Sequence, residues 1–272
     1  MIGVLFIPRI KVNITILLIT IIVAFFTKAI NLWAFVPITI LVCSSYLYFK
    51  KENLKKPIAI GLYLVILVVS IGLLMHKLPG FNNLKLIDSI TLTSFSVPYT
   101  MWLNVDKPIL AIIILLFSGY CLTVKGRDWH KIFQISLLSA ITCLVVLIVP
   151  VILSGIIKFD PKLPDISPLW LINMLFIVCF AEEVFFRYFI QGSFTKALGF
   201  KYGQYIAIIL SSLIFGLAHL PGGVIFALFA FIAGIFYGYS YYKTKSIECA
   251  ILTHFMVNMT HFVAFTYPLA KS

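Results

Sequence analysis

Long apolar runs separated by short polar connectors occupy most of the chain between residues 12 and 268. The runs are long enough to cross a bilayer as helices, and they lack the two-residue alternation of membrane strands. We therefore predict an all-α fold class, a polytopic transmembrane helical bundle of about 8 or 9 spans, which forms a single membrane domain over residues 1–272. The predicted spans are 12–27, 29–49, 57–75, 108–123, 132–156, 169–195, 204–219, 223–242 and 247–268.

The longest predicted connector, residues 76–107, mixes apolar and polar side chains. Pro79 and Pro98 divide it into pieces, because proline interrupts regular hydrogen bonding. This pattern favours an interfacial or re-entrant segment that lies on the surface as a connector. A lid over a site is the alternative.

The composition agrees with a membrane protein, since 62% of the residues are hydrophobic and only 11% are charged. The net charge of +12 does not indicate nucleic acid as a partner, because the basic residues lie between apolar spans and form no basic face. Their position indicates membrane topology and contact with anionic lipid instead. The sequence gives no oligomeric state.

The basic residues predict an orientation in which the N-terminus is inside, because cytoplasmic connectors are enriched in lysine and arginine. In that orientation 13 of the 21 basic residues face the cytoplasm and 7 face outward. The abundance of isoleucine, lysine and asparagine is typical of a bacterial protein, so we expect an integral protein of a bacterial cytoplasmic membrane. The 13 basic residues predicted to face the cytoplasm are Arg9, Lys11, Lys50, Lys51, Lys55, Lys56, Lys125, Arg127, Lys131, Lys196, Lys201, Lys243 and Lys245.

Two adjacent glutamates, Glu182 and Glu183, interrupt the apolar stretch 169–190. An ionisable group at bilayer depth is costly, so it is usually paired or functional. Arg187 lies four residues after Glu183, on the same helix face, which predicts an ion pair, and Gln191 continues that stripe. Glu182 lies about 100° around the helix and is predicted to face a cavity, where a carboxylate suits general acid–base chemistry. A salt bridge between helices without chemistry is the alternative.

Three further polar residues fall in the C-terminal apolar runs. His219 ends one run, and Phe215, one turn earlier, can pack against its ring; a catalytic role and a packing role both stay open. His254 and Asn258 lie four residues apart on one helix face, where each can donate a hydrogen bond, as an oxyanion hole requires. His261 is nearly on that face, but its place near the end of the span favours packing.

The segment from Gly234 to Gly238 has the small-residue spacing G-x-x-x-G, and Ala230 precedes it by one turn. Small residues at this interval let helices approach closely. We therefore predict helix packing here and not a ligand-binding loop.

Together these motifs resemble the CAAX-protease and bacteriocin-processing family, also called the abortive-infection family, which consists of intramembrane glutamic endopeptidases. Its motif E-E-x-x-x-R is present as Glu182–Arg187, F-x-x-x-H as Phe215–His219, and H-x-x-x-N as His254–Asn258. The resemblance covers residues 168–266, which are the expected catalytic core.

The resemblance implies a role for each motif residue. Glu182 and His219 are implied to activate a water molecule, and His254 and Asn258 to hold the developing oxyanion. The residues with implied supporting roles are Glu183, Arg187 and Phe215.

The expected reaction is hydrolysis of a peptide bond without an acyl-enzyme, and no cofactor or metal is expected. The implied substrates are membrane-associated: a leader peptide, a pheromone or bacteriocin precursor, or a CAAX-type C-terminus. A zinc metalloprotease stays open, although the soluble zincin motif H-E-x-x-H is absent. A non-enzymatic immunity or scaffold protein also stays open, as does a transporter.

Overall fold

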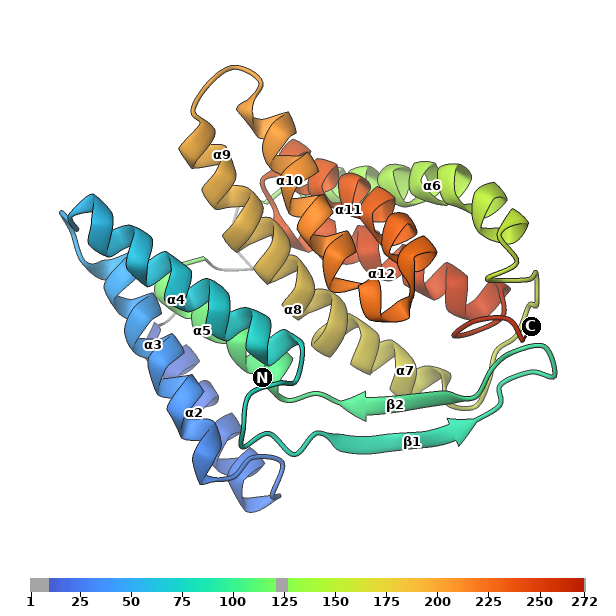
Figure 1. Cartoon of the computed structure of the whole chain (residues 1–272), viewed down its shortest axis with the longest axis horizontal. Helices are drawn as coiled ribbons and strands as arrows, with labels where there is room; N and C mark the ends of the chain where they lie inside the picture. Colours follow the sequence, from blue (N-terminus) through green and yellow to red (C-terminus); the bar gives the residue numbers. More distant parts are fainter. Residues whose placement is uncertain (1–9, 121–126, 272) are drawn as a thin grey trace. The chain divides into compact units, whose positions relative to one another are not determined.

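The computed structural model describes residues 10–120 and 127–271, which form two compact units (Figure 1). Unit 1 lies within residues 1–84, 102–127 and 180–184, and unit 2 within residues 85–101, 128–179 and 185–272. The predicted catalytic core, 168–266, lies in unit 2 except for 180–184. Arg9 and Lys125, which entered the predicted topology, lie outside the described residues.

Helix α5 is the buried centre of unit 1. Its residues 108–116 are buried, and α2, α3 and α4 each pack against it. The helix ends at Gly119, whose φ of 74° is the left-handed conformation that glycine adopts without strain. The elements of unit 1 are α2 (Ile10–Phe26), the 3-10 turn η1 (Leu32–Ala34), α3 (Phe35–Lys50), α4 (Lys56–Leu74), α5 (Asp106–Ser118) and α8 (Phe180–Glu183).

Helix α11 occupies the corresponding place in unit 2, where it packs against α6, α10 and α12. Its buried residues are mostly small, so the neighbouring helices approach closely. The helices of unit 2 are α6 (Trp129–Leu153), α7 (Ser167–Asn173), η2 (Met174–Cys179), η3 (Val184–Gln191), α9 (Gly192–Leu198), α10 (Gly203–Ala218), η4 (Leu220–Gly222), α11 (Val224–Thr244) and α12 (Ile247–Ala264).

The connector predicted as an interfacial or re-entrant segment contains a pair of strands. Strand β1 (Leu84–Ile90) pairs with β2 (Tyr99–Leu103), and the two run in opposite directions (Figure 1). Within unit 2, the loop between them is tied to the end of the chain, since the Val97 N–H donates to the Leu269 carbonyl over 3.1 Å. The sequence pattern does not predict these strands, because they are short and only weakly alternating.

The apolar helices confirm a helical membrane bundle. In the described part of the chain, six helices are long and apolar enough to cross a membrane, and Leu17–Phe26 and Gly203–Ala218 are shorter apolar helices. The predicted count of eight or nine spans is not confirmed by helix length. The predicted span 108–123 is the clearest difference, because α5 has 13 residues and is about 20 Å long. The six helices that are long and apolar enough to cross a membrane are Leu32–Lys50, Lys56–Leu74, Trp129–Leu153, Ser167–Leu198, Val224–Thr244 and Ile247–Ala264.

Candidate functional site

The helix Ser167–Leu198, which carries the two glutamates, is not a regular α-helix. The single α-helical turn α8 lies between two π-helical segments, η2 and η3. Segments of π-helix are rare and occur frequently at functional sites. Because they shift hydrogen bonding from i+4 to i+5, the face assignments made for an ideal α-helix do not hold beyond Glu183.

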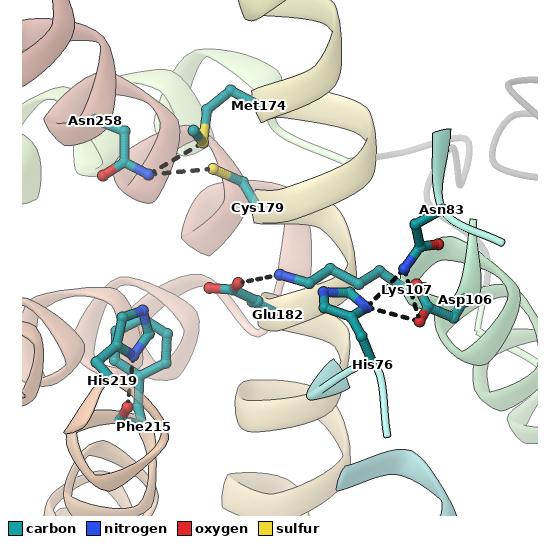
Figure 2. A network of polar contacts seen from close by, with 10 residues as sticks. All are labelled: His76, Asn83, Asp106, Lys107, Met174, Cys179, Glu182, Phe215, His219 and Asn258. Carbon is teal, nitrogen blue, oxygen red and sulfur yellow. Dashed lines mark hydrogen bonds and ion pairs between the residues drawn. The ribbon is translucent and has the colours of Figure 1, made fainter. Parts of the chain in front are cut away.

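Glu182 forms an ion pair within unit 1. The Lys107 ammonium donates to Glu182 Oε1 over 3.0 Å, and the two side chains are only 12% and 10% exposed (Figure 2). Glu183 is fully buried. The sequence predicts that Glu182 faces a cavity and assigns Lys107 to an outer connector, so this ion pair is not predicted. The available signal was a lysine at the start of an apolar run, but nothing in the sequence linked it to a glutamate 75 residues away.

Asp106, beside Lys107, is the centre of a second polar group in unit 1. Its side chain is buried; Oδ1 accepts the Lys107 backbone N–H over 3.0 Å. Oδ2 lies 2.6 Å from His76 Nδ1 and accepts a longer hydrogen bond of 3.4 Å from Asn83 (Figure 2). The first turn of α5 is therefore held in place by a buried carboxylate.

In unit 2, the ring of Phe215 is the point at which three predicted site residues meet. The His219 ring lies 4.5 Å from it and the His254 ring 5.8 Å, between ring centroids. The Arg187 guanidinium carbon lies 5.1 Å from the Phe215 centroid. The structure thus brings Arg187, His219 and His254 around one aromatic side chain.

His219 is held by its own helix. Its Nδ1 lies 2.8 Å from the carbonyl oxygen of Phe215, at the end of α10 (Figure 2). A carbonyl can only accept, so Nδ1 carries the proton of the neutral ring. The other nitrogen, Nε2, is then unprotonated and can accept a proton or a hydrogen bond.

His254 and Asn258 lie on one face of α12, as predicted, and have different surroundings. His254 is buried, and its ring stacks on Tyr237 at 4.5 Å between centroids. Asn258 Nδ2 points to two sulfur atoms, at 3.3 Å from Met174 Sδ and 3.9 Å from Cys179 Sγ (Figure 2). Sulfur is a weak acceptor, so the Asn258 amide can exchange these contacts for a stronger acceptor at little cost.

Arg187 is fully buried and has hydroxyl partners that the sequence does not predict. Its Nη1 donates to Ser211 Oγ over 3.2 Å and to Ser212 Oγ over 3.5 Å. Ser211 Oγ also lies 3.3 Å from Gln191 Oε1, so the predicted stripe from Arg187 to Gln191 rests on α10. The predicted Glu183–Arg187 ion pair stays a prediction.

Gly234 and Gly238, which are predicted to serve helix packing, lie against side chains of other helices. A Cβ at Gly234 would lie 3.3 Å from Arg187 Nη2, and one at Gly238 would lie 2.7 Å from Gln191 Oε1. A Cβ at either position would require a neighbouring side chain to shift, so the two glycines fit the predicted role in helix packing. His261 Nε2 lies 3.2 Å from the Thr266 carbonyl oxygen, and its packing or interfacial role at the end of α12 stays a prediction.

No group of three or more histidine, cysteine, aspartate or glutamate side chains that could hold a metal ion is found among residues 10–120 and 127–271. Glu182 and Glu183 belong to unit 1, and His219, His254, Asn258 and Arg187 belong to unit 2.

Residues 164–260 match the Rce1-like family model, described as type II CAAX prenyl endopeptidase Rce1-like. The matched segment contains all three motifs and covers most of the predicted catalytic core. No curated protein and no solved structure matches the chain. The match confirms the resemblance carried by the motifs and indicates a CAAX-type intramembrane endopeptidase.

Proposed function

We propose that this chain, whose residues 164–260 match the Rce1-like family of CAAX-type proteases, is a glutamic endopeptidase that cleaves a membrane-associated peptide or protein. In the proposed reaction Glu182, aided by His219, takes a proton from a water molecule as the water oxygen attacks the scissile carbonyl. The tetrahedral intermediate then collapses, the C–N bond breaks, and the proton passes to the leaving amine. No acyl-enzyme forms.

The observation that carries this proposal is the hydrogen bond that fixes the His219 ring. With Nδ1 donating to the Phe215 carbonyl, Nε2 presents a lone pair, which is the state that a proton acceptor needs. The contact between the His219 and Phe215 rings restricts the imidazole further.

His254 and Asn258 are the proposed oxyanion donors. Both project from one face of α12, and the Asn258 amide donates to two weak sulfur acceptors within unit 2. A developing negative charge on the carbonyl oxygen binds an amide N–H far more strongly than a thioether does. Arg187, Glu183 and Phe215 are proposed to support the site.

The protein is an integral membrane protein, and we propose that it lies in a bacterial cytoplasmic membrane with its N-terminus inside. The proposed catalytic core is 168–266, within a single polytopic membrane domain. Proposed substrates are a leader peptide, a pheromone or bacteriocin precursor, or a CAAX-type C-terminus. Lipid is the expected surrounding partner, and nucleic acid is not expected.

The test is cleavage in liposomes of a mixed set of prenylated C-terminal peptides, leader peptides and pheromone precursors. Wild type is compared with Glu182→Gln and His219→Ala, each with and without a strong chelator. We expect chelator-resistant cleavage by wild type and none by either variant. The control is His130→Ala, because His130 is exposed at the start of α6 and its ring bonds to Gln134 on the same helix.

The same experiment separates the competing functions. Cleavage that stops on chelation and returns with added zinc would identify a metalloprotease. Cleavage that persists in Glu182→Gln would remove Glu182 from the chemistry. A cellular phenotype of protection against a bacteriocin that survives Glu182→Gln would identify an immunity or scaffold protein.

A further inference from the structure

Lys107 has the contacts of a residue that serves Glu182. It is the second residue of α5, and its ammonium lies 3.0 Å from Glu182 Oε1. Both side chains are nearly removed from water, where opposite charges interact far more strongly than at a surface. The pair Lys85–Asp88 has almost the same length, 2.9 Å, but its side chains are 40% and 64% exposed, so solvent screens it.

The position of Lys107 is fixed by its neighbour Asp106. The Asp106 carboxylate accepts the Lys107 backbone N–H, and its second oxygen is occupied by His76 and Asn83. Asp106 also lies in the first turn of α5, where the helix dipole stabilises a negative charge. Asp106 is thus satisfied by groups other than the Lys107 ammonium, which reaches Glu182 instead (Figure 2).

The surroundings of Glu182 in unit 1 give this cation a role. Glu183 follows it directly on the same helix and is fully buried, so a second carboxyl group lies beside it. Helix α5 packs against α8 in unit 1, and it contributes Lys107 to that contact. Burial and a neighbouring carboxylate both favour the protonated form of a carboxyl group, whereas a cation at hydrogen-bond distance favours the ionised form.

We propose that Lys107 is a positioning residue that keeps Glu182 ionised and in one orientation, and this rests on the proposed role of Glu182 as the proton acceptor. A protonated carboxyl group cannot take a proton from water, so the base is competent only when ionised. Lys107 keeps it competent at neutral pH. Asp106 holds Lys107, and His76 and Asn83 hold Asp106.

The first measurement needs no substrate. Infrared titration of the protein in lipid follows the carbonyl band of a protonated carboxyl group, and the band of Glu182 is identified by its loss in Glu182→Gln. We expect this band to appear at a higher pH in Lys107→Met than in wild type, and near the wild-type pH in Lys107→Arg. Lys85→Met, which removes the exposed cation, leaves it unchanged. An unchanged band in Lys107→Met overturns the proposal.

The second measurement is the pH dependence of cleavage. Because the base must be ionised, loss of Lys107 moves the acid limb of the kcat profile to higher pH and lowers kcat at neutral pH by up to about 100-fold. KM changes little, since Lys107 does not touch the substrate. Lys107→Arg restores most of the activity. A purely structural role would lower activity without moving the acid limb, which also overturns the proposal.

Folding of the variants is controlled separately. Lys107→Gln keeps a hydrogen-bond donor without the charge. If Lys107→Met unfolds, the double variant Lys107→Met/Glu182→Gln is used in its place, because it removes both charges of the pair. If Lys107→Met cleaves with the wild-type profile while Glu182→Gln is inactive, the positioning role fails and the protease stands. If Glu182→Gln cleaves as wild type does, the proposed function fails whatever the infrared titration gives.

Discussion

The two units of this protein satisfy their intramembrane polar groups in different ways. In unit 1 the carboxyl groups have basic partners, with Lys107 on Glu182 and His76 on Asp106. In unit 2 they are held by neutral groups and rings: His219 by a carbonyl and Phe215, His254 by Tyr237, and Asn258 by two sulfur atoms.

The difference has a chemical consequence. A charged pair fixes an ionisation state, because separating the charges inside an apolar protein is costly. Neutral and aromatic contacts fix the orientation of a ring or amide without fixing a charge. Unit 1 is therefore suited to setting a charge, and unit 2 to presenting donors and acceptors.

The largest effect that tests this comparison is expected at His219. Replacing it by alanine removes the Nε2 acceptor, and we expect kcat to fall by about 100- to 10,000-fold, the usual contribution of general acid–base catalysis. Cleavage of the peptide identified in liposomes measures the loss. His130→Ala should cleave at the wild-type rate. If His219→Ala retains full kcat, the ring packs on Phe215 and takes no part in the reaction.

The next effect is expected at Asn258. Loss of one oxyanion donor lowers kcat by about 100- to 1,000-fold, so Asn258→Ala should fall in that range with KM nearly unchanged. Its thermal unfolding should stay close to wild type, because the contacts that the amide gives up are to sulfur. The matched variant is Asn82→Ala, whose exposed amide bonds to the Lys28 carbonyl. A large loss of stability in Asn258→Ala with normal kcat would reverse this assignment.

The sequence was informative where the bilayer imposes strict rules. Apolar runs must be helical, so each predicted span coincides at least in part with a helix of the described residues. Polar residues are costly there, so Glu182, His219 and Asn258 could be identified as outliers. The pairing of His254 and Asn258 followed from four-residue spacing on one regular helix, α12.

The sequence could not reveal contacts that depend on tertiary packing. Lys107 reaches Glu182 across 75 residues, and the stacking of Tyr237 on His254 joins two different helices. The π-helical segment η3 also replaced the ideal geometry that was assumed for Arg187. In each case the local pattern was compatible with several partners, and only the packed helices select one.

A smaller effect is expected where unit 2 brings its helices together. A Cβ at Gly216 would lie 2.8 Å from both the Ala227 carbonyl oxygen and Phe231 Cβ, on α11. Backbone atoms cannot move aside, so Gly216→Ala should lower the free energy of unfolding by about 1–3 kcal/mol. Gly61→Ala is the control, since nothing lies within 4 Å of its added carbon, and it should stabilise α4 by about 0.5–1 kcal/mol. Unfolding in mixed micelles measures both, and equal stability of the two variants would exclude tight packing beside Phe215.

The smallest effect is expected at the exposed pair Lys85–Asp88 of unit 2, which is a reference for the buried pair Lys107–Glu182 of unit 1. The hydrogen bond from Lys85 holds the pKa of Asp88 below its ordinary value. Any stabilisation of the folded protein by this pair is therefore present at a pH above the ordinary pKa of aspartate, and it is lost as the pH falls through the lowered pKa of Asp88. Solvent screens both side chains, so Lys85→Met should unfold at the wild-type temperature at pH 7. Lys107→Met at the same pH should unfold at a lower temperature, because it removes the buried counter-charge that Lys107 supplies to Glu182. Equal melting temperatures for the two variants would mean that burial adds nothing to the Lys107–Glu182 pair.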